Sequence, residues 1–164
     1  QKEVAVAKGS LENLRLIPEN PTPTHEGLAA IANADYITFG PGSWFSSVLP
    51  HVLVAQQRKA IVESRATKVI ILNLDAAPHM KGDELAGSSP ADHLHVLRSF
   101  APDLACDIAL VDSAVASQSD VLSELEQLVS GMGGRVIVAD LASHQGSNHH
   151  DPEKLFSAFS HIFQ

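Results

Sequence analysis

The stretch that decides the fold is Asp35-Tyr36-Ile37-Thr38-Phe39-Gly40-Pro41-Gly42-Ser43, at residues 35–43 of the 164-residue chain. Residues 35–39 are rich in aromatic and β-branched side chains and predict a strand. Gly40, Pro41 and Gly42 predict a turn, and Ser43 is a residue type that commonly begins a helix. A strand that enters a helix through a glycine-rich turn is the building unit of parallel α/β sheets.

The same two patterns alternate from residue 24 onward. Helices are predicted at residues 24–34, 43–64 with an interruption at Pro50, 89–100, 119–130 and 152–163. Strands are predicted at residues 35–39, 68–74, 107–111 and 135–139. Several of these strands are continuous apolar runs, which is typical of strands covered by helices on both faces. We therefore predict a three-layer, mostly parallel, doubly wound Rossmann-like α/β fold that binds ligands beyond the carboxyl ends of its strands.

Residues 1–23 differ in pattern from the rest. Residues 3–7 and 14–17 predict two short extended pieces, a β-hairpin-like segment, and the prolines at 18, 21 and 23 predict an extended linker. We expect residues 24–164 to form the ligand-binding portion.

Composition narrows the class of protein. The chain is 45% hydrophobic and 18% charged, as in one ordinary globular domain, and its net charge of −8 disfavours a nucleic-acid-binding or anionic-membrane surface. No apolar run approaches the roughly 20 residues of a membrane span. We expect a cytoplasmic protein without membrane insertion. The single cysteine, Cys106, excludes an intrachain disulfide, and the apolar run beside it predicts a buried thiol.

The turn at residues 40–43 has the outline of an anion site. Gly40 and Gly42 let backbone N–H groups approach a phosphate, a helix start adds unpaired donors, and hydroxyls are available from Ser43, Ser46 and Ser47. No lysine follows the glycines, so the turn is not a P-loop, and it also lacks the G-x-G-x-x-G dinucleotide pattern. A Gly-Pro-Gly turn that only caps a helix is an equal alternative.

Polar residues elsewhere on the expected ligand side are further candidates. Asn73 ends an apolar strand, where a ligand contact is favoured over a loop tether. Residues 76–88 predict a polar loop that either closes as a lid or is an ordinary surface loop. Asp112 and Asp140 also end strands, as loop caps or ligand contacts.

Asp92 and His93 stand in the first turn of the helix at residues 89–100. Asp92 is the candidate catalytic residue, as a general base or a contact to a ligand hydroxyl, and its alternative role is to cap the helix behind Ser89. The histidines at 93, 95, 144, 149 and 150 do not have a spacing such as H-E-x-x-H, so we predict no metal site. No G-x-S-x-G elbow or activated cysteine supports a hydrolase.

Residues 34–54 read A-D-Y-I-T-F-G-P-G-S-W-F-S-S-V-L-P-H-V-L-V. This resembles the signature A-D-x-I-x-x-G-P-G-S-x-[YF]-[TS]-S-[VI]-[LI]-P-x-L-L-V of the YvcK-type gluconeogenesis factors of bacteria, a branch of the CofD-like 2-phospho-L-lactate transferase family. Residues 68–74 are similar to that branch's K-V-x-x-x-N-L, residues 89–93 to its S-x-x-D-H, and residues 16–21 to the linker before the signature. The resemblance covers nearly the whole chain.

The resemblance implies a Rossmann-like fold in which the turn at 40–43 helps to build a nucleotide-ligand site. It implies a non-enzymatic protein that binds a UDP-sugar and affects carbon metabolism, cell-wall synthesis and cell shape. The alternative is a transferase that moves a phospholactyl group from a nucleotide-activated donor to a deazaflavin, with Mg²⁺ needed and Asp92 assisting. No intrinsic cofactor is expected, and a homodimer and a regulatory protein partner are left open.

Two departures from the family pattern stand out. The glycine-rich G-G-G-T-G loop of the family's N-terminal strand is not in this sequence, so we expect a C-terminal portion of a longer protein that carries part of the phosphate site. Where the branch has a loop like Q-P-G-E-T-x-G, residues 76–84 read A-A-P-H-M-K-G-D-E. Contacts from that loop are therefore not expected here.

Overall fold

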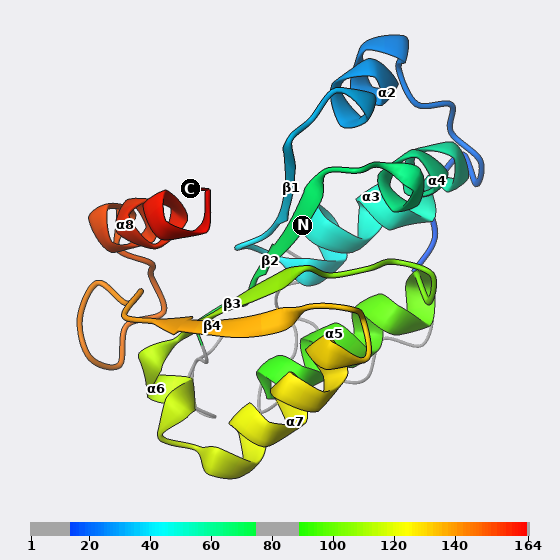
Figure 1. The fold of residues 1–164 in the computed structure, drawn as a ribbon. Helices are drawn as coiled ribbons and strands as arrows, with labels where there is room; N and C mark the ends of the chain where they lie inside the picture. Colours follow the sequence, from blue (N-terminus) through cyan, green and yellow to red (C-terminus); the bar gives the residue numbers. More distant parts are fainter. Residues whose placement is uncertain (1–13, 75–88, 164) are drawn as a thin grey trace.

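A parallel four-stranded sheet, in the order β1-β2-β3-β4, organises the computed structural model, which describes residues 14–74 and 89–163 (Figure 1). The strands are β1 (Tyr36–Phe39), β2 (Thr67–Ile71), β3 (Ile108–Asp112) and β4 (Arg135–Ala139). Phe39 lies opposite Ile70 and Asp112 opposite Ala139. Because all four strands are parallel, their carboxyl ends meet at one rim of the sheet, as the sequence predicted.

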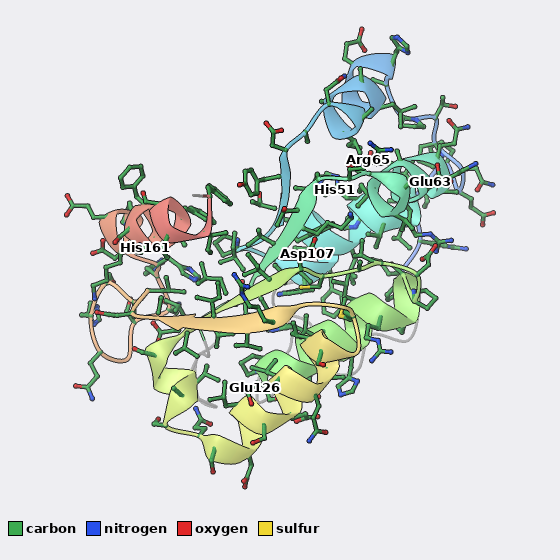
Figure 2. All side chains as sticks on the ribbon, viewed as in Figure 1. His51, Glu63, Arg65, Asp107, Glu126 and His161 are labelled. Carbon is green, nitrogen blue, oxygen red and sulfur yellow. The ribbon has the colours of Figure 1, made fainter. Side chains whose placement is uncertain are left out.

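Helices cover both faces of this sheet (Figure 1). One face carries the π-helix η1 (Trp44–Val48), α3 (Leu49–Leu53), α4 (Ala55–Glu63), α5 (Pro90–Phe100) and α7 (Ser119–Ser130). The other face carries α8 (Pro152–Ile162), whose Leu155 and Phe159 pack on Val69 and Leu110. Glu126 on α7 and His161 on α8, both exposed, lie on opposite sides of the sheet (Figure 2). The three-layer α/β prediction is confirmed.

The predicted helix at residues 43–64 is wrong in detail. The segment consists of η1, α3 and α4. The helical conformation is interrupted at Val54, whose backbone is extended with φ −78° and ψ 103°. Pro50 lies in the first turn of α3. A proline there costs nothing, because its missing N–H would have had no partner inside the helix.

Other boundaries differ by a few residues. Helix α2 (His25–Ala32) begins after Thr24, whose hydroxyl accepts the Gly27 N–H at 3.0 Å, and β2 ends three residues before the predicted end of its strand. A short helix that the sequence did not predict, α6 (Ser113–Ala116), follows β3. Residues 14–17 join no strand of the sheet described, and predictions for residues 3–7 and 76–88 lie outside the described residues.

The amino rim of the sheet is closed by local contacts. The Asp107 carboxylate, labelled in Figure 2, accepts the Lys68 N–H at 2.7 Å. The buried Lys68 ammonium donates to the carbonyls of Ser64 and Ala66 at 2.8 and 3.2 Å. Because the Asp107 carboxylate and the Lys68 ammonium have partners within the amino rim, we look for a site at the carboxyl rim.

Among the helices described, none has both the length and the apolar character to cross a membrane.

Candidate phosphate-binding turn and strand-end cavity

The Gly-Pro-Gly turn needs its glycines. Gly40 has φ +75° and Gly42 has φ +147°, in the region that side chains disfavour, and the Gly40–Pro41 peptide is cis. A Cβ on Gly40 would lie 2.7 Å from the Ile71 carbonyl oxygen. The turn therefore passes so close to the end of β2 that no other residue fits at position 40.

Asn73 holds the turn from the neighbouring strand end. Its side-chain oxygen accepts the Gly42 N–H at 3.0 Å, and its side-chain nitrogen donates to the Gly42 carbonyl at 3.0 Å. These two bonds fix both polar groups of one peptide residue across 31 positions of sequence. The loop-tether role of Asn73 is thus seen directly, and a ligand contact through its remaining hydrogen-bonding capacity stays a prediction.

The serines after the turn form their own hydrogen-bond group. Ser43 Oγ accepts the Ser46 N–H at 3.1 Å, the two hydroxyls are in short contact, and the Ser47 N–H donates to the Ser43 carbonyl at 2.9 Å. The helix that follows is a π-helix rather than the α-helix that the sequence suggested. Single turns of π-helix are common at functional sites. Ser47 is exposed, and with Gly40 it borders a cavity of 220 Å³ beside the turn.

Asp92 and His93 play different parts in the structure. Asp92 Oδ2 accepts the Ser89 N–H at 2.7 Å while the Asp92 N–H faces Ser89 Oγ at 3.4 Å, so the two residues form a capping box at the start of α5. His93 is buried and stacks on Trp44, the first residue of η1. Of this pair, His93 rather than Asp92 therefore supports the turn, through its contact with Trp44. A catalytic role for Asp92 stays a prediction.

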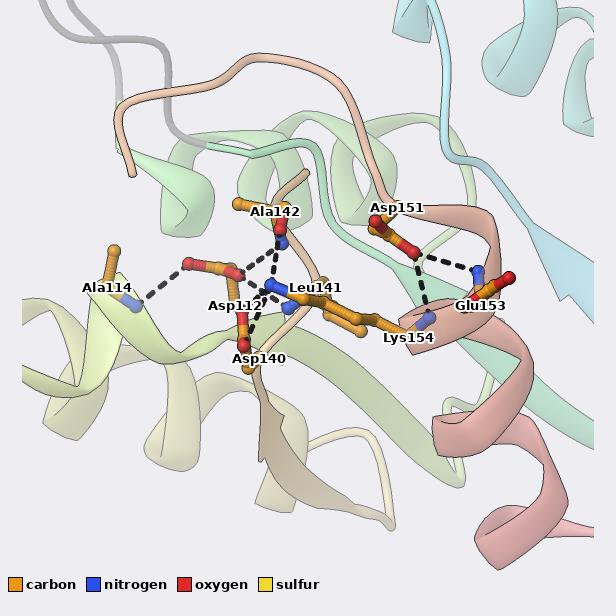
Figure 3. Close-up of polar contacts among 8 residues, drawn as sticks. All are labelled: Asp112, Ala114, Asp140, Leu141, Ala142, Asp151, Glu153 and Lys154. Carbon is orange, nitrogen blue, oxygen red and sulfur yellow. Dashed lines mark hydrogen bonds and ion pairs between the residues drawn. The ribbon is translucent and has the colours of Figure 1, made fainter. Parts of the chain in front are cut away.

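Asp112 organises the rim beyond β3 and β4 (Figure 3). Its carboxylate accepts the Ala114 N–H at 2.9 Å, the Leu141 N–H at 2.8 Å and the Ala142 N–H at 3.0 Å. One buried side chain thereby caps α6 and binds the chain that leaves β4. Of the two roles that the sequence left open, the structure shows the loop cap.

Asp140 forms an ion pair that the sequence did not indicate. The Lys154 ammonium lies 2.9 and 2.8 Å from the two Asp140 oxygens and donates to the Ala142 carbonyl at 2.7 Å (Figure 3). Asp151 begins α8 by accepting the N–H groups of Glu153 and Lys154 at 2.9 and 3.1 Å. The start of α8 is thus bound to the segment that leaves β4.

A cavity of 530 Å³ opens among these residues, and we call it the strand-end cavity. It lies between the carboxyl ends of β3 and β4 and the start of α8, and its walls include Leu74, Asp112, Ser117, Asp140, Ser147 and Lys154. Sequence reasoning did not identify the serines or Lys154 as site residues, because they come from the end of α6, a polar loop and α8. The one feature that these residues share in the sequence is that each lies in a segment that follows β3 or β4.

Two titratable side chains near the sheet have shifted pKa values. Burial lowers the pKa of His150 below its usual 6.5, opposed by the Leu72 backbone and the Asp112 carboxylate. Burial, with a smaller effect of the Asp107 charge, raises the pKa of the Cys106 thiol to about 12. Cys106 is buried and free, as the sequence predicted. Within residues 14–74 and 89–163, no three His, Cys, Asp or Glu side chains gather as metal ligands would.

Comparisons with known proteins point to one family. The family model described as "2-phospho-L-lactate transferase CofD" matches residues 1–144. A Mycobacterium tuberculosis protein named "Putative gluconeogenesis factor" is 36% identical over 155 residues, which cover 94% of this chain and 44% of the relative. An Aquifex aeolicus protein of the same name is 32% identical over 163 residues, covering 93% and 48%. A crystal structure of a Bacillus halodurans protein has a TM-score of 0.67 at 28% identity, covering 89% of this chain and 49% of that one.

A parallel sheet with helices on both faces and a glycine-rich turn at its carboxyl rim defines a Rossmann-like α/β protein. The chain belongs to the CofD family. Its relatives named as gluconeogenesis factors confirm the YvcK-type resemblance of residues 34–54. The chain spans about half the length of these relatives, so what a whole protein of this kind does is taken up below as a proposal.

Proposed function

We propose that the turn at residues 40–43 binds the phosphate of a nucleotide-linked ligand of the UDP-sugar class. The protein senses this ligand and regulates carbon metabolism, cell-wall synthesis and cell shape without turning the ligand over. The two hydrogen bonds between Asn73 and Gly42 are the observation that carries the proposal. They hold the turn in one shape before a ligand arrives, which reduces the ordering cost of binding.

The contacts available to a phosphate differ from those that the sequence suggested. The Gly42 N–H donates to Asn73 and the Ser46 N–H to Ser43 Oγ, so these two amides already have partners. The Ser43 and Ser46 hydroxyls are in contact, and a hydroxyl can both donate and accept hydrogen bonds. We expect these hydroxyls and that of Ser47 to make the main side-chain contacts to the phosphate.

A binding role is favoured over catalysis by the position of Asp92. One of its oxygens is held by the Ser89 N–H in the capping box, which orients the carboxylate toward its own helix. The names of the relatives favour a regulatory role in carbon use. The description of the family model favours the second candidate, a phospholactyl transferase acting on a deazaflavin.

Calorimetric titration of UDP-N-acetylglucosamine into the full-length protein that contains this chain tests the proposal. We expect Asn73→Ala to weaken binding by up to about thirtyfold, since it removes two hydrogen bonds worth about 1 kcal/mol each. Ser43→Ala should also weaken it. Asn33→Ala is the matched control, because the Asn33 side chain donates to the Ala29 carbonyl at 2.8 Å at the end of α2. It should leave binding unchanged.

Two results would decide against a sensor. Absence of binding by the wild-type protein, or equal binding by wild type and Asn73→Ala, removes the proposed site. Product formation from a deazaflavin and a nucleotide-activated phospholactate in the presence of Mg²⁺ would instead establish the transferase.

A further inference from the structure

The strand-end cavity has the size of a ligand pocket. Its 530 Å³ falls within the range of about 300–1,000 Å³ that small-molecule sites occupy. It lies at the carboxyl ends of parallel strands, where α/β proteins bind ligands. Nothing in the role of the turn at 40–43 accounts for this second hollow on the same rim.

The charges of the cavity are already balanced by protein groups. The Asp112 carboxylate accepts three backbone N–H groups, and the Asp140 carboxylate is paired with the Lys154 ammonium. The ammonium makes its remaining contact with the Ala142 carbonyl. A phosphate group placed in this cavity would lie near the Asp112 and Asp140 carboxylates. The one cation there, the Lys154 ammonium, is already bound to Asp140, so phosphate binding would be unfavourable.

The rest of the lining consists of His144, apolar residues and neutral polar groups. The Ser113 hydroxyl and the Gln145 side-chain amide form no hydrogen bond with any other described residue, and both border the cavity. Ser117 Oγ donates to the Ala114 carbonyl and keeps its lone pairs as acceptors. Hydroxyl and amide groups that both donate and accept are suited to an uncharged, hydroxyl-rich ligand.

The cavity and the turn are joined by consecutive residues. Asn73 holds Gly42, and the next residue, Leu74, is part of the cavity wall. Neighbouring strands lie about 4.8 Å apart, so the turn at the end of β1 and the cavity between β3 and β4 are separated by two to three strand spacings, about 10–14 Å. A single ligand of ordinary size can reach from one to the other.

We propose that the strand-end cavity receives the uncharged, hydroxyl-rich part of a ligand, such as a sugar, whose phosphate lies at the turn. This inference rests on the proposed function and adds which end of the ligand lies at which end of the rim. The diphosphate, which joins the sugar to the nucleoside, lies at residues 40–47, and the sugar lies among Ser113, Ser117 and Gln145.

The first test compares UDP with UDP-N-acetylglucosamine in the full-length protein by calorimetry. Ser113→Trp places a bulky ring at the cavity, and Ser130→Trp places the same ring at the exposed end of α7 as the control. We expect Ser113→Trp to lower the affinity for UDP-N-acetylglucosamine at least tenfold, to that of UDP, while UDP binding stays unchanged. An unchanged ratio of the two affinities would overturn the proposal.

The second test needs no variant. In amide NMR spectra of the wild-type protein, the signals of Ser117 and Gly146 should shift with UDP-N-acetylglucosamine and not with UDP, whereas those at residues 40 and 42 should shift with both. Equal shifts of Ser117 and Gly146 with both ligands would refute the sugar site. If neither ligand shifts the signals of residues 40 and 42, the proposed phosphate site is wrong. The cavity is then tested with free N-acetylglucosamine. Shifted signals of Ser117 and Gly146 would support a sugar site there, and unshifted signals would refute it.

Discussion

The indole of Trp44 lies parallel to the imidazole of His93, with ring centroids 4.9 Å apart and planes 5° apart. Both side chains are buried, at 1% and 5% exposed. Trp44 directly follows the Gly-Pro-Gly-Ser turn, and His93 lies in the first turn of α5. The stack therefore holds the turn against α5, a helix that begins only at Pro90.

Removal of the imidazole should loosen this support. We expect His93→Ala to lower the free energy of unfolding by about 2–4 kcal/mol, because it leaves a cavity beside a buried ring, whereas His93→Phe should retain most of the stacking. Trp44 is the only tryptophan in the chain, so its fluorescence reports on this position. Its emission should shift to longer wavelength in His93→Ala and stay near the wild-type value in His93→Phe. Identical spectra and stabilities for both variants would contradict the supporting role.

Substitution of Gly40 should lower the stability of the folded protein by more than its backbone angle alone explains. Gly40 and Gly146 have nearly the same φ, +75° and +76°, but only the Gly40 Cβ would meet another atom, the Ile71 carbonyl oxygen. Each alanine variant should lose about 1–2 kcal/mol from left-handed strain, with an additional loss of at least about 1 kcal/mol for Gly40→Ala. Urea midpoints of the two variants measure the difference. Equal midpoints would show that the turn moves away from β2 without cost.

The stability of the protein should fall at acidic pH through His150. Burial lowers its pKa in the folded protein, so the unfolded chain binds more protons as the pH drops below 6.5. Stability from this group is then unchanged above about pH 7.5 and decreases from pH 6.5 down to the lowered pKa. His150→Gln should flatten the dependence of the urea midpoint on pH, relative to His149→Gln at the exposed neighbouring position. If the urea midpoints of the two variants depended equally on pH, His150 would not be the cause of the loss of stability at acidic pH.

The thiol of Cys106 should be inert in the folded protein. Its pKa is raised to about 12 by burial, and its Sγ donates to the Ile108 carbonyl at 3.3 Å, so almost no thiolate exists at pH 8. Alkylation by iodoacetamide should be at least about a hundredfold slower in the native protein than in urea. Since the chain has one cysteine, mass spectrometry reads this rate directly. Rapid native labelling would mean that the end of α7 opens readily.

Local sequence signals were sufficient for several elements. The bounds of α7 and β4 agree with the prediction, and the Ser89–Asp92 capping box is confirmed. Each of these depends on residues within one or two turns of chain, where capping and hydrophobic periodicity act. The core strands were likewise visible as apolar runs because helices cover them on both faces.

The site depended on contacts between distant residues, which no local pattern contains. Asn73 could be placed on the rim from its position after an apolar strand, but its bond to Gly42 follows from the packing of β1 beside β2. The pairing of Lys154 with Asp140 depends in the same way on how α8 returns to the sheet. The π-helix, which buries Trp44, Phe45 and Val48, and the break at Val54 were not indicated by local propensity.

The consecutive order of the four strands makes the rim collinear with the gene. The carboxyl ends of β1, β2, β3 and β4 lie along the rim in the order in which they are encoded. An insertion or an exchanged segment therefore alters one position along the ligand and leaves its neighbours in place. Under the proposed function, such a rim can acquire a new specificity piece by piece, with the turn at 40–43 kept constant while the loops after β3 and β4 diversify.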